Sequence, residues 1–185
     1  MEPVLLASLW QPIVLSAILV FIASSIVWMV LPHHRSDWKK LPDEGAVRRV
    51  LEGVEPGSYT FPYAQSAEDW KSEAWIAAVT KGPNGMLTVL PPGPPAMGKK
   101  MLSWFIYLLV VSTFVAYLTG RVLPAGTAYL EVFRVAGTAA FLAYSCAHVA
   151  NAVWMGHAWS RTIKDVLDGL AYALLTAGAF GWLWP

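Results

Sequence analysis

The chain has 185 residues, of which 56% are hydrophobic and 14% are charged, and its formal net charge is +1. Soluble domains carry about a quarter charged residues, so this composition excludes a disordered chain and a coiled coil and indicates a membrane protein. The near-neutral charge argues against a nucleic-acid partner. The single cysteine, Cys146, excludes an internal disulfide and a cysteine-based metal site.

Four stretches are long and apolar enough to cross a bilayer, whose core of about 30 Å takes about 20 helical residues. They are residues 12–31, 101–122, 130–155 and 166–184. The first has no positive n-region, because Glu2 is the only early charge, so we interpret it as a retained span rather than a cleaved signal peptide. The expected fold class is an all-α membrane protein with four transmembrane helices and a small cytoplasmic α+β insertion between the first two.

These spans divide the chain into an N-terminal span (1–31), an extramembrane segment (32–100) and a three-span membrane region (101–185). Lys and Arg residues gather at both ends of the middle segment and again between the third and fourth spans. The positive-inside rule therefore predicts that residues 32–100 are cytoplasmic and that both termini are periplasmic, in the inner membrane of a bacterium. Seven of the ten Trp residues fall at predicted span ends, where indole rings favour the headgroup region.

Short elements are predicted inside the extramembrane segment. Helical spacing of apolar residues predicts a helix over residues 45–55. A capping box from Ser66 to Asp69 predicts the start of a second short helix. A strong turn signal at Asn84-Gly85 predicts a β-hairpin that pairs residues 74–80 with 86–90.

Small residues recur at four-residue steps in the last two predicted spans. They are Ala139, Ala143 and Ala147 in the third span, and Gly169, Ala173, Ala177 and Gly181 in the fourth. This spacing lets two helix backbones approach closely. It predicts a tight antiparallel pair of these helices and fits contact with another membrane subunit equally well.

Five polar residues fall inside predicted spans and need a physical reason, because polar groups are costly in hydrocarbon. Glu131 and Arg134 lie near the outer interface, where they can pair with each other or extend to the headgroups. Asp168 lies near the cytoplasmic end of the fourth span, where we expect it to meet His148 or Asn151.

His148 is the candidate cofactor-binding residue. An intramembrane histidine can ligate a haem or chlorin, relay a proton, or hydrogen-bond to a neighbour. Hydrogen bonding is favoured, because no other predicted span has a central histidine to serve as a second axial ligand. His33 and His34 are interpreted as a solvated flank, since adjacent residues of a helix do not converge on one ion, and no metal site is expected.

Residues 97–121 and 168–185 resemble uncharacterised multi-pass membrane proteins of bacteria. Small Trp-rich proteins of this kind are also similar to auxiliary subunits of bioenergetic complexes, including photosynthetic reaction centres. The resemblance implies an accessory or structural subunit that stabilises or assembles a larger photosynthetic or respiratory complex of the cytoplasmic membrane. Its expected partners are the lipid bilayer and other integral membrane subunits.

Two alternatives stand beside the accessory subunit. A small transporter or channel would use Asp168, Asn151 and His148 to line a path. A tetrapyrrole- or quinone-binding protein would centre on His148. No catalytic motif occurs at recognisable spacing, so an enzyme is not expected.

Overall fold

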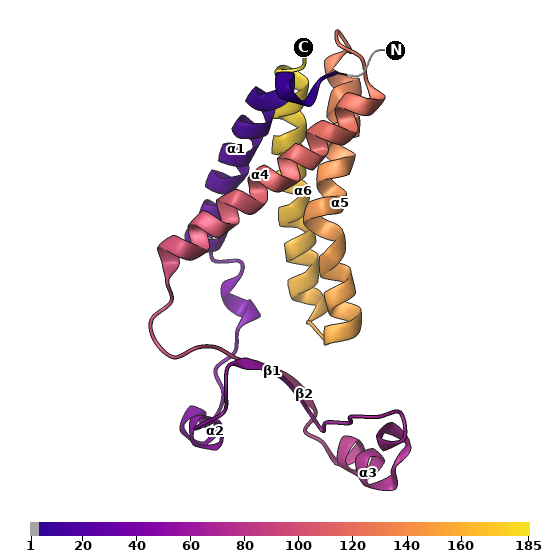
Figure 1. Cartoon of the computed structure of the whole chain (residues 1–185). Coiled ribbons are helices and arrows are strands. Elements are labelled where there is room, and N and C mark those ends of the chain that lie inside the picture. Colours follow the sequence, from indigo (N-terminus) through magenta and orange to yellow (C-terminus); the bar gives the residue numbers. More distant parts are fainter. Residues whose placement is uncertain (1–3) are drawn as a thin grey trace. The chain divides into compact units, whose positions relative to one another are not determined.

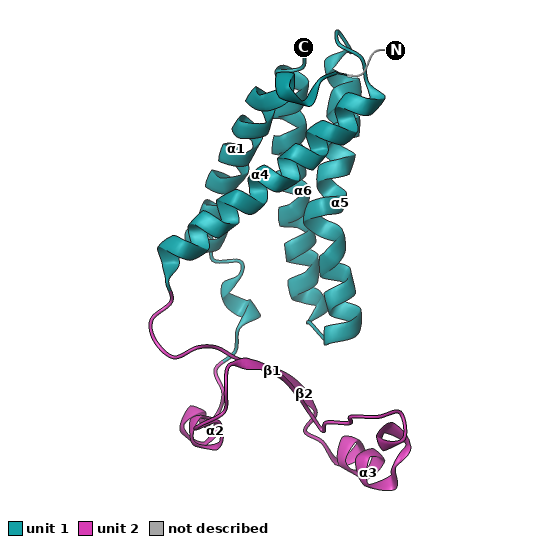
Figure 2. Cartoon of the chain, viewed as in Figure 1, with its two compact units in different colours: residues 1–39, 96–185 teal, residues 40–95 magenta. Residues whose placement is uncertain are grey.

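The computed structural model describes residues 4–185, which form two compact units that are described separately here (Figure 2). Unit 1 combines the N-terminal part up to Lys39 with residues 96–185, and unit 2 comprises residues 40–95. The helices of unit 1 are η1 (Leu6–Leu9), α1 (Trp10–Met29), η2 (Arg35–Asp37), α4 (Met97–Val122), α5 (Tyr129–Met155) and α6 (Trp159–Trp182), where η marks a 3₁₀-helix.

Three helical stretches are long and apolar enough to cross a membrane: Leu6–Met29, α4 and α5. The chain is therefore a small multi-pass membrane protein. The sequence predicts a fourth span over residues 166–184, and α6 does cover most of that range with 24 residues. However, α6 begins at Trp159, and its N-terminal part carries four charged residues. These lower its mean hydropathy, so α6 is not among the helices that are apolar enough to count as candidate spans.

The four long helices of unit 1 pack against one another, each contacting two of the others. Helices α5 and α6 lie side by side, joined by a short turn in which Gly156 adopts the left-handed φ of 67° (Figure 1). Helix α1 contacts both α4 and α6, and α4 also contacts α5. Each of the four helices therefore has at least two helical neighbours.

Backbone hydrogen bonds bring the described start of the chain and the C-terminus to one end of unit 1. The Val4 amide donates to the Gly120 carbonyl at 2.9 Å, and the Gly126 amide donates to the Pro185 carbonyl at 2.7 Å. The indole of Trp184 also donates to the Pro124 carbonyl at 2.9 Å. Helix α6 therefore runs from the α5–α6 turn back to the connection between α4 and α5.

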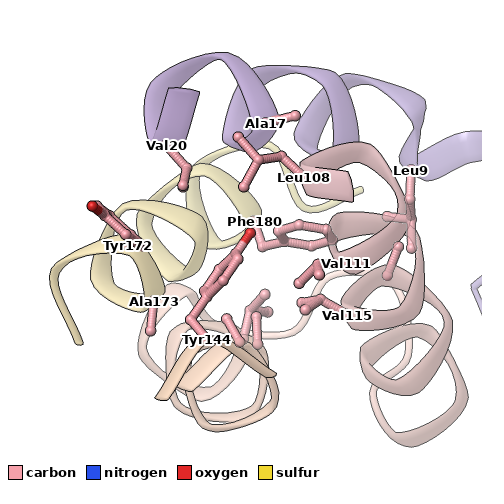
Figure 3. Close-up of a cluster of buried hydrophobic side chains, with 14 residues drawn as sticks. Leu9, Ala17, Val20, Leu108, Val111, Val115, Tyr144, Tyr172, Ala173 and Phe180 are labelled. Carbon is pink, nitrogen blue, oxygen red and sulfur yellow. The ribbon is translucent and has the colours of Figure 1, made fainter. Parts of the chain in front are cut away.

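The core of unit 1 is built from apolar side chains of all four long helices (Figure 3). Phe180 of α6 is fully buried, as are Leu108 of α4 and Val20 of α1. A buried hydrogen bond from the Ser16 hydroxyl to the Ser112 hydroxyl, 3.0 Å long, also ties α1 to α4. Such bonds between small polar side chains stabilise helix contacts inside a membrane.

Small residues of α6 face α5, with Ala173 and Ala177 buried in the interface. A Cβ atom added at Gly169 would collide with the Ser145 hydroxyl and lie 2.9 Å from the Tyr144 carbonyl oxygen. The two backbones therefore approach closely, which is the geometry that such spacing favours.

The remaining small residues of the predicted faces take different positions. A Cβ atom at Gly181 would lie 2.7 Å from the Tyr129 ring, so this glycine also serves the α5–α6 contact. On α5, Ala139 packs against the core, whereas Ala143 and Ala147 are exposed and line a cavity. The α5 surface that meets α6 includes Gly137 instead, whose added Cβ would lie 3.1 Å from Ala177.

Unit 2 is a small α+β insertion between the first two candidate spans. Its elements are α2 (Glu44–Val50), β1 (Gly57–Phe61), η3 (Asp69–Lys71), α3 (Glu73–Lys81) and β2 (Gly85–Val89). The two strands are antiparallel, and Gly57 pairs with Val89 while Phe61 pairs with Gly85. The helix predicted over residues 45–55 forms only its first half, because α2 ends at Val50.

The strand predicted over residues 74–80 is wrong, because these residues form α3. The Ser72 side chain caps this helix by accepting from the Trp75 amide at 3.2 Å, and Gly82 ends it with a φ of 63°. The partner of β2 is β1, a more distant part of the sequence. Cap residues at both ends therefore outweighed the turn signal that predicted a tight hairpin.

The predicted capping box is confirmed. The Ser66 amide donates to the Asp69 carboxylate at 2.8 Å, and the Asp69 amide donates to the Ser66 hydroxyl at 3.1 Å. It opens the short 3₁₀ turn η3.

Candidate functional site

A cluster of ionisable side chains joins the segment after α1 to the first half of α6. His33, His34 and Asp37 come from the segment, and Lys164 and Asp168 come from α6. We refer to these five residues as the His34 cluster. They link parts of the chain that lie more than 120 positions apart in sequence.

His34 is the centre of this cluster because both of its ring nitrogens face a carboxylate. Its Nδ1 lies 2.6 Å from Asp37 Oδ2, and its Nε2 lies 2.7 Å from Asp168 Oδ2. The neighbouring His33 places its Nε2 3.3 Å from Asp168 Oδ1. Asp168 thus receives one imidazole on each carboxylate oxygen.

The local backbone explains how two adjacent histidines reach one carboxylate. Helix α1 ends at Met29, and the Arg35 amide then donates to the Pro32 carbonyl in a turn that leads into η2. Because His33 and His34 lie in this turn, helical spacing does not separate their side chains. The prediction of a solvated flank is wrong for His34, whose side chain is only 5% exposed.

Packing and charge determine the electrostatics of His34. The Trp28 ring stacks on the imidazole with a centroid distance of 4.0 Å and an interplanar angle of 6°. Burial by itself lowers the pKa of His34, but hydrogen bonds to Asp37 and Asp168 and the charges of these carboxylates outweigh it, so the pKa lies above its usual value. The cluster therefore favours a positive charge at this imidazole.

Lys164 fixes the segment after α1 onto α6. Its ammonium donates to the His33 carbonyl at 2.6 Å, to the Ser36 hydroxyl at 2.8 Å and to Asp37 Oδ1 at 2.6 Å. Burial raises the pKa of Asp37, but the hydrogen bonds from Lys164 and His34 and their charges outweigh it, so the pKa lies below its usual value. Asp37 is therefore an ionised carboxylate although its side chain is only 2% exposed.

A cavity of about 650 Å³ lies next to the cluster, bounded by residues of α1, α4, α5 and α6. Aromatic side chains form much of its wall, including Trp28, Trp104 and Tyr107. Its polar lining includes His148, Asp165 and Asp168. An apolar cavity with a few polar groups is the usual form of a small-molecule site.

Two tyrosine hydroxyls on the cavity wall are left without a partner. The side chains of Tyr144 and Tyr172 are buried, and within residues 4–185 neither hydroxyl forms a hydrogen bond. Their rings meet edge to face, with centroids 6.0 Å apart, and Figure 3 shows Tyr144 extending from α5 and Tyr172 from α6. Buried hydroxyls are normally hydrogen-bonded, so these two lack their usual partner. Both oxygens are closed to the cavity in this structure, so a bound molecule would accept from them only after the tyrosine side chains turn toward it.

The structure places His148 on the cavity wall but does not bring Asp168 to it. His148 Nδ1 lies 3.7 Å from Asp165 Oδ2, so Asp165 is its carboxylate neighbour. The expected contact of Asp168 with His148 or Asn151 is absent from the described residues, because Asp168 is bound by His33 and His34. Asn151 is exposed on α5.

Glu131 and Arg134 are both exposed near the start of α5. Between residues 4 and 185, neither side chain forms an ion pair. Arg121 contacts the Tyr117 ring instead of Glu131, with its guanidinium carbon 5.5 Å from the ring centroid. Both side chains are therefore free of the helix bundle and can extend to the lipid headgroups.

Sequence reasoning missed four residues of the site: Asp37, Lys164, Tyr144 and Tyr172. Two of them carried a usable signal. Asp37 follows His34 by three positions, and Lys164 precedes Asp168 by four, so each pair can share one side of a helical turn. The two tyrosines lay among many other aromatic residues and had no such signal.

Comparison with known proteins finds no matching family model, no matching curated protein and no matching solved structure.

Proposed function

We propose that this chain is a membrane protein that binds a membrane-soluble molecule of the quinone class in the cavity between α1, α4, α5 and α6. The observation that carries the proposal is the pair of unpartnered hydroxyls of Tyr144 and Tyr172 on the cavity wall. A buried polar group without a partner costs about 1–3 kcal/mol. A ligand carbonyl would remove that cost by accepting from these hydroxyls, provided that binding turns the two tyrosine side chains toward the cavity.

The other groups of the cavity fit the same ligand. A quinone presents carbonyl acceptors on a flat ring and an apolar tail, which suit the aromatic wall formed by Trp28, Trp104 and Tyr107. His148, beside Asp165, supplies a third polar contact. A tetrapyrrole is less favoured, because His148 is the one histidine among the described lining residues and a six-coordinate haem takes a second axial ligand.

The accessory-subunit hypothesis from the sequence is compatible with this site, because quinones are the mobile electron carriers of photosynthetic and respiratory complexes. The small residues of α6, including Ala173 and Ala177, lend it no separate support, since they pack within the chain. The transporter hypothesis is less favoured, because Asp168 is engaged by two histidines.

We also propose that α6 is a fourth span, with residues 32–100 cytoplasmic and both termini periplasmic in a bacterial inner membrane. The bond between Gly126 and Pro185 supports this, because α6 must then run the full distance between the two ends of unit 1. The charges of Lys164, Asp165 and Asp168 have partners inside the helix bundle, which reduces the cost of placing them at the membrane boundary.

Binding of decylubiquinone to the purified full chain in lipid nanodiscs tests the proposal. We expect saturable binding at one molecule per chain by isothermal titration calorimetry. Tyr144→Phe and Tyr172→Phe keep the rings but remove one hydroxyl each, so each should weaken binding about tenfold, the equivalent of one hydrogen bond of about 1.4 kcal/mol.

Tyr117→Phe is the matched control, since this exposed tyrosine of α4 lies outside the cavity and should leave binding unchanged. Absence of saturable binding would contradict the proposal. So would equal binding by the wild-type chain and both cavity variants.

A further inference from the structure

We infer that His33, His34 and Asp168 form a binding site for a divalent transition metal of the zinc class, with Asp37 orienting His34. This site goes beyond the proposed quinone site and uses different ligand atoms. It rests on the geometry of the His34 cluster, the donor set and the local charge.

The geometry brings ligand atoms of His33, His34 and Asp168 close enough to share one cation, once His34 Nε2 and Asp168 Oδ2 move slightly apart to admit it. If Nδ1 of His34 carries a hydrogen and donates to Asp37 at 2.6 Å, then Nε2 of the neutral ring carries a lone pair. That lone pair faces a carboxylate oxygen of Asp168 at only 2.7 Å. In the metal-free cluster a proton on Nε2 makes this contact a hydrogen bond, and a bound metal ion would take the place of that proton.

The three groups that converge here form a recognised ligand set. One atom each of His33, His34 and Asp168 lies within 4.8 Å of the other two. Two imidazole nitrogens and one carboxylate oxygen bind zinc and related divalent ions, with a fourth position left for water or another ligand. This site differs from an ordinary surface cluster of acidic residues, because it combines imidazole and carboxylate ligands and because His34 is buried.

The groups around these ligands match the usual outer shell of a metal site. Metal-binding histidines commonly donate their second ring N–H to a carboxylate, which sets the tautomer and the ring orientation. Asp37 supplies that carboxylate. Lys164 binds the other oxygen of Asp37 at 2.6 Å, so this carboxylate is held in its orienting position.

Local charge also favours a cation. Once a metal ion has displaced the proton of His34, the cluster holds the carboxylates of Asp37 and Asp168 against the single ammonium of Lys164. The nearby Arg161 and Asp165 lie 3.7 Å apart and offset each other. A metal ion in place of that proton would therefore meet one unbalanced negative charge within the His34 cluster, and Lys100 is a further cation on the wall of the adjoining cavity.

Access to the site is available from two sides. The His33 side chain is 34% exposed, and Asp168 belongs to the wall of the cavity as well as to the ligand set. An ion held by Asp168 would therefore lie at the polar part of the cavity lining.

The test is metal binding by the full chain, purified in detergent with a tag that contains no histidine and stripped with EDTA. Titration with Co²⁺ should produce visible d–d absorption that saturates at one ion per chain, and Zn²⁺ should displace it. His33→Ala, His34→Ala and Asp168→Asn should each weaken Co²⁺ binding at least 100-fold. Asp37→Asn should weaken it about 10- to 100-fold, as expected for an outer-shell group.

His157→Ala is the matched control, because His157 is exposed in the turn between α5 and α6 and should leave binding unchanged. Circular dichroism of each variant identifies loss of fold, and the isosteric Asp168→Asn change keeps the test usable if an alanine variant unfolds. The inference is overturned if folded wild-type chain binds no stoichiometric Co²⁺ or Zn²⁺. It is also overturned if folded Asp168→Asn binds Co²⁺ as the wild type does. Decylubiquinone binding is measured separately, so failure of one site is distinct from failure of the other.

Discussion

Single residues determine how closely α5 and α6 approach. At Gly169 an added methyl group would meet the Ser145 hydroxyl and the Tyr144 backbone, whereas Gly98 in the first turn of α4 has no atom within 4 Å of the same position. Both are helical glycines, but only Gly169 belongs to the four-residue pattern of small residues that predicts close helix packing. The structure identifies the atoms of α5 that make this contact close.

We expect Gly169→Ala to destabilise the protein by about 2 kcal/mol, because overpacking of a close helix contact forces the backbones apart. Gly98→Ala should be neutral or stabilise by up to about 1 kcal/mol, because it adds helix propensity without a clash. Equilibrium unfolding in mixed micelles measures both. Equal stability of the two variants would contradict the prediction, because it would mean that α5 and α6 lie far enough apart at Gly169 to accept a methyl group.

The segment after α1 is held by side chains rather than by regular secondary structure. Its 3₁₀-helix η2 has three residues and no side-chain cap. Lys164 nevertheless binds three oxygen atoms of the segment, one each from His33, Ser36 and Asp37. Helix ends and short 3₁₀ turns open readily unless tertiary contacts hold them. The order of this segment therefore depends on side chains of α6, with Lys164 holding His33, Ser36 and Asp37 while Asp168 holds the two imidazoles.

Lys164→Met keeps the apolar stem and removes that ammonium. We expect the amides of residues 33–37 to exchange hydrogen about 100-fold faster, because the buried Asp37 carboxylate loses its cation at a cost of about 3 kcal/mol. Adding Asp37→Asn should recover part of the loss, since it removes the unpaired charge. Lys99→Met, at an exposed position of α4, is the control, and unchanged exchange in Lys164→Met would refute the role of Lys164.

The number of crossings is a property of the complete chain. The Gly126–Pro185 bond brings the C-terminus to the connection between α4 and α5. If α4 and α5 cross the membrane, a C-terminus on that side requires α6 to cross as well. Three crossings would leave it on the side of the α5–α6 turn.

Cysteine labelling separates the two cases in a Cys146→Ser background. We expect a membrane-impermeant maleimide to label Ala125→Cys and Pro185→Cys in intact bacterial cells. Ser58→Cys and His157→Cys should react only after the cells are permeabilised. A Pro185→Cys chain that behaves like Ser58→Cys would show that α6 does not cross.

Local patterns in the sequence determined the long helices, the presence of an α+β insertion and the Ser66–Asp69 capping box, because these depend on hydropathy and on residues a few positions apart. The same reasoning assigned residues 74–80 to a strand, since it weighed the turn signal above the Ser72 and Gly82 caps.

Only the tertiary structure decided what the polar residues contact. His34 and Asp168 lie 134 positions apart, and no local period specifies that pairing. The cavity likewise exists because four helices leave a space beside Tyr144 and Tyr172, which depends on how whole helices pack. The sequence thus determined that this is a small multi-pass membrane protein, and the packing of its helices determined where a ligand or an ion has partners.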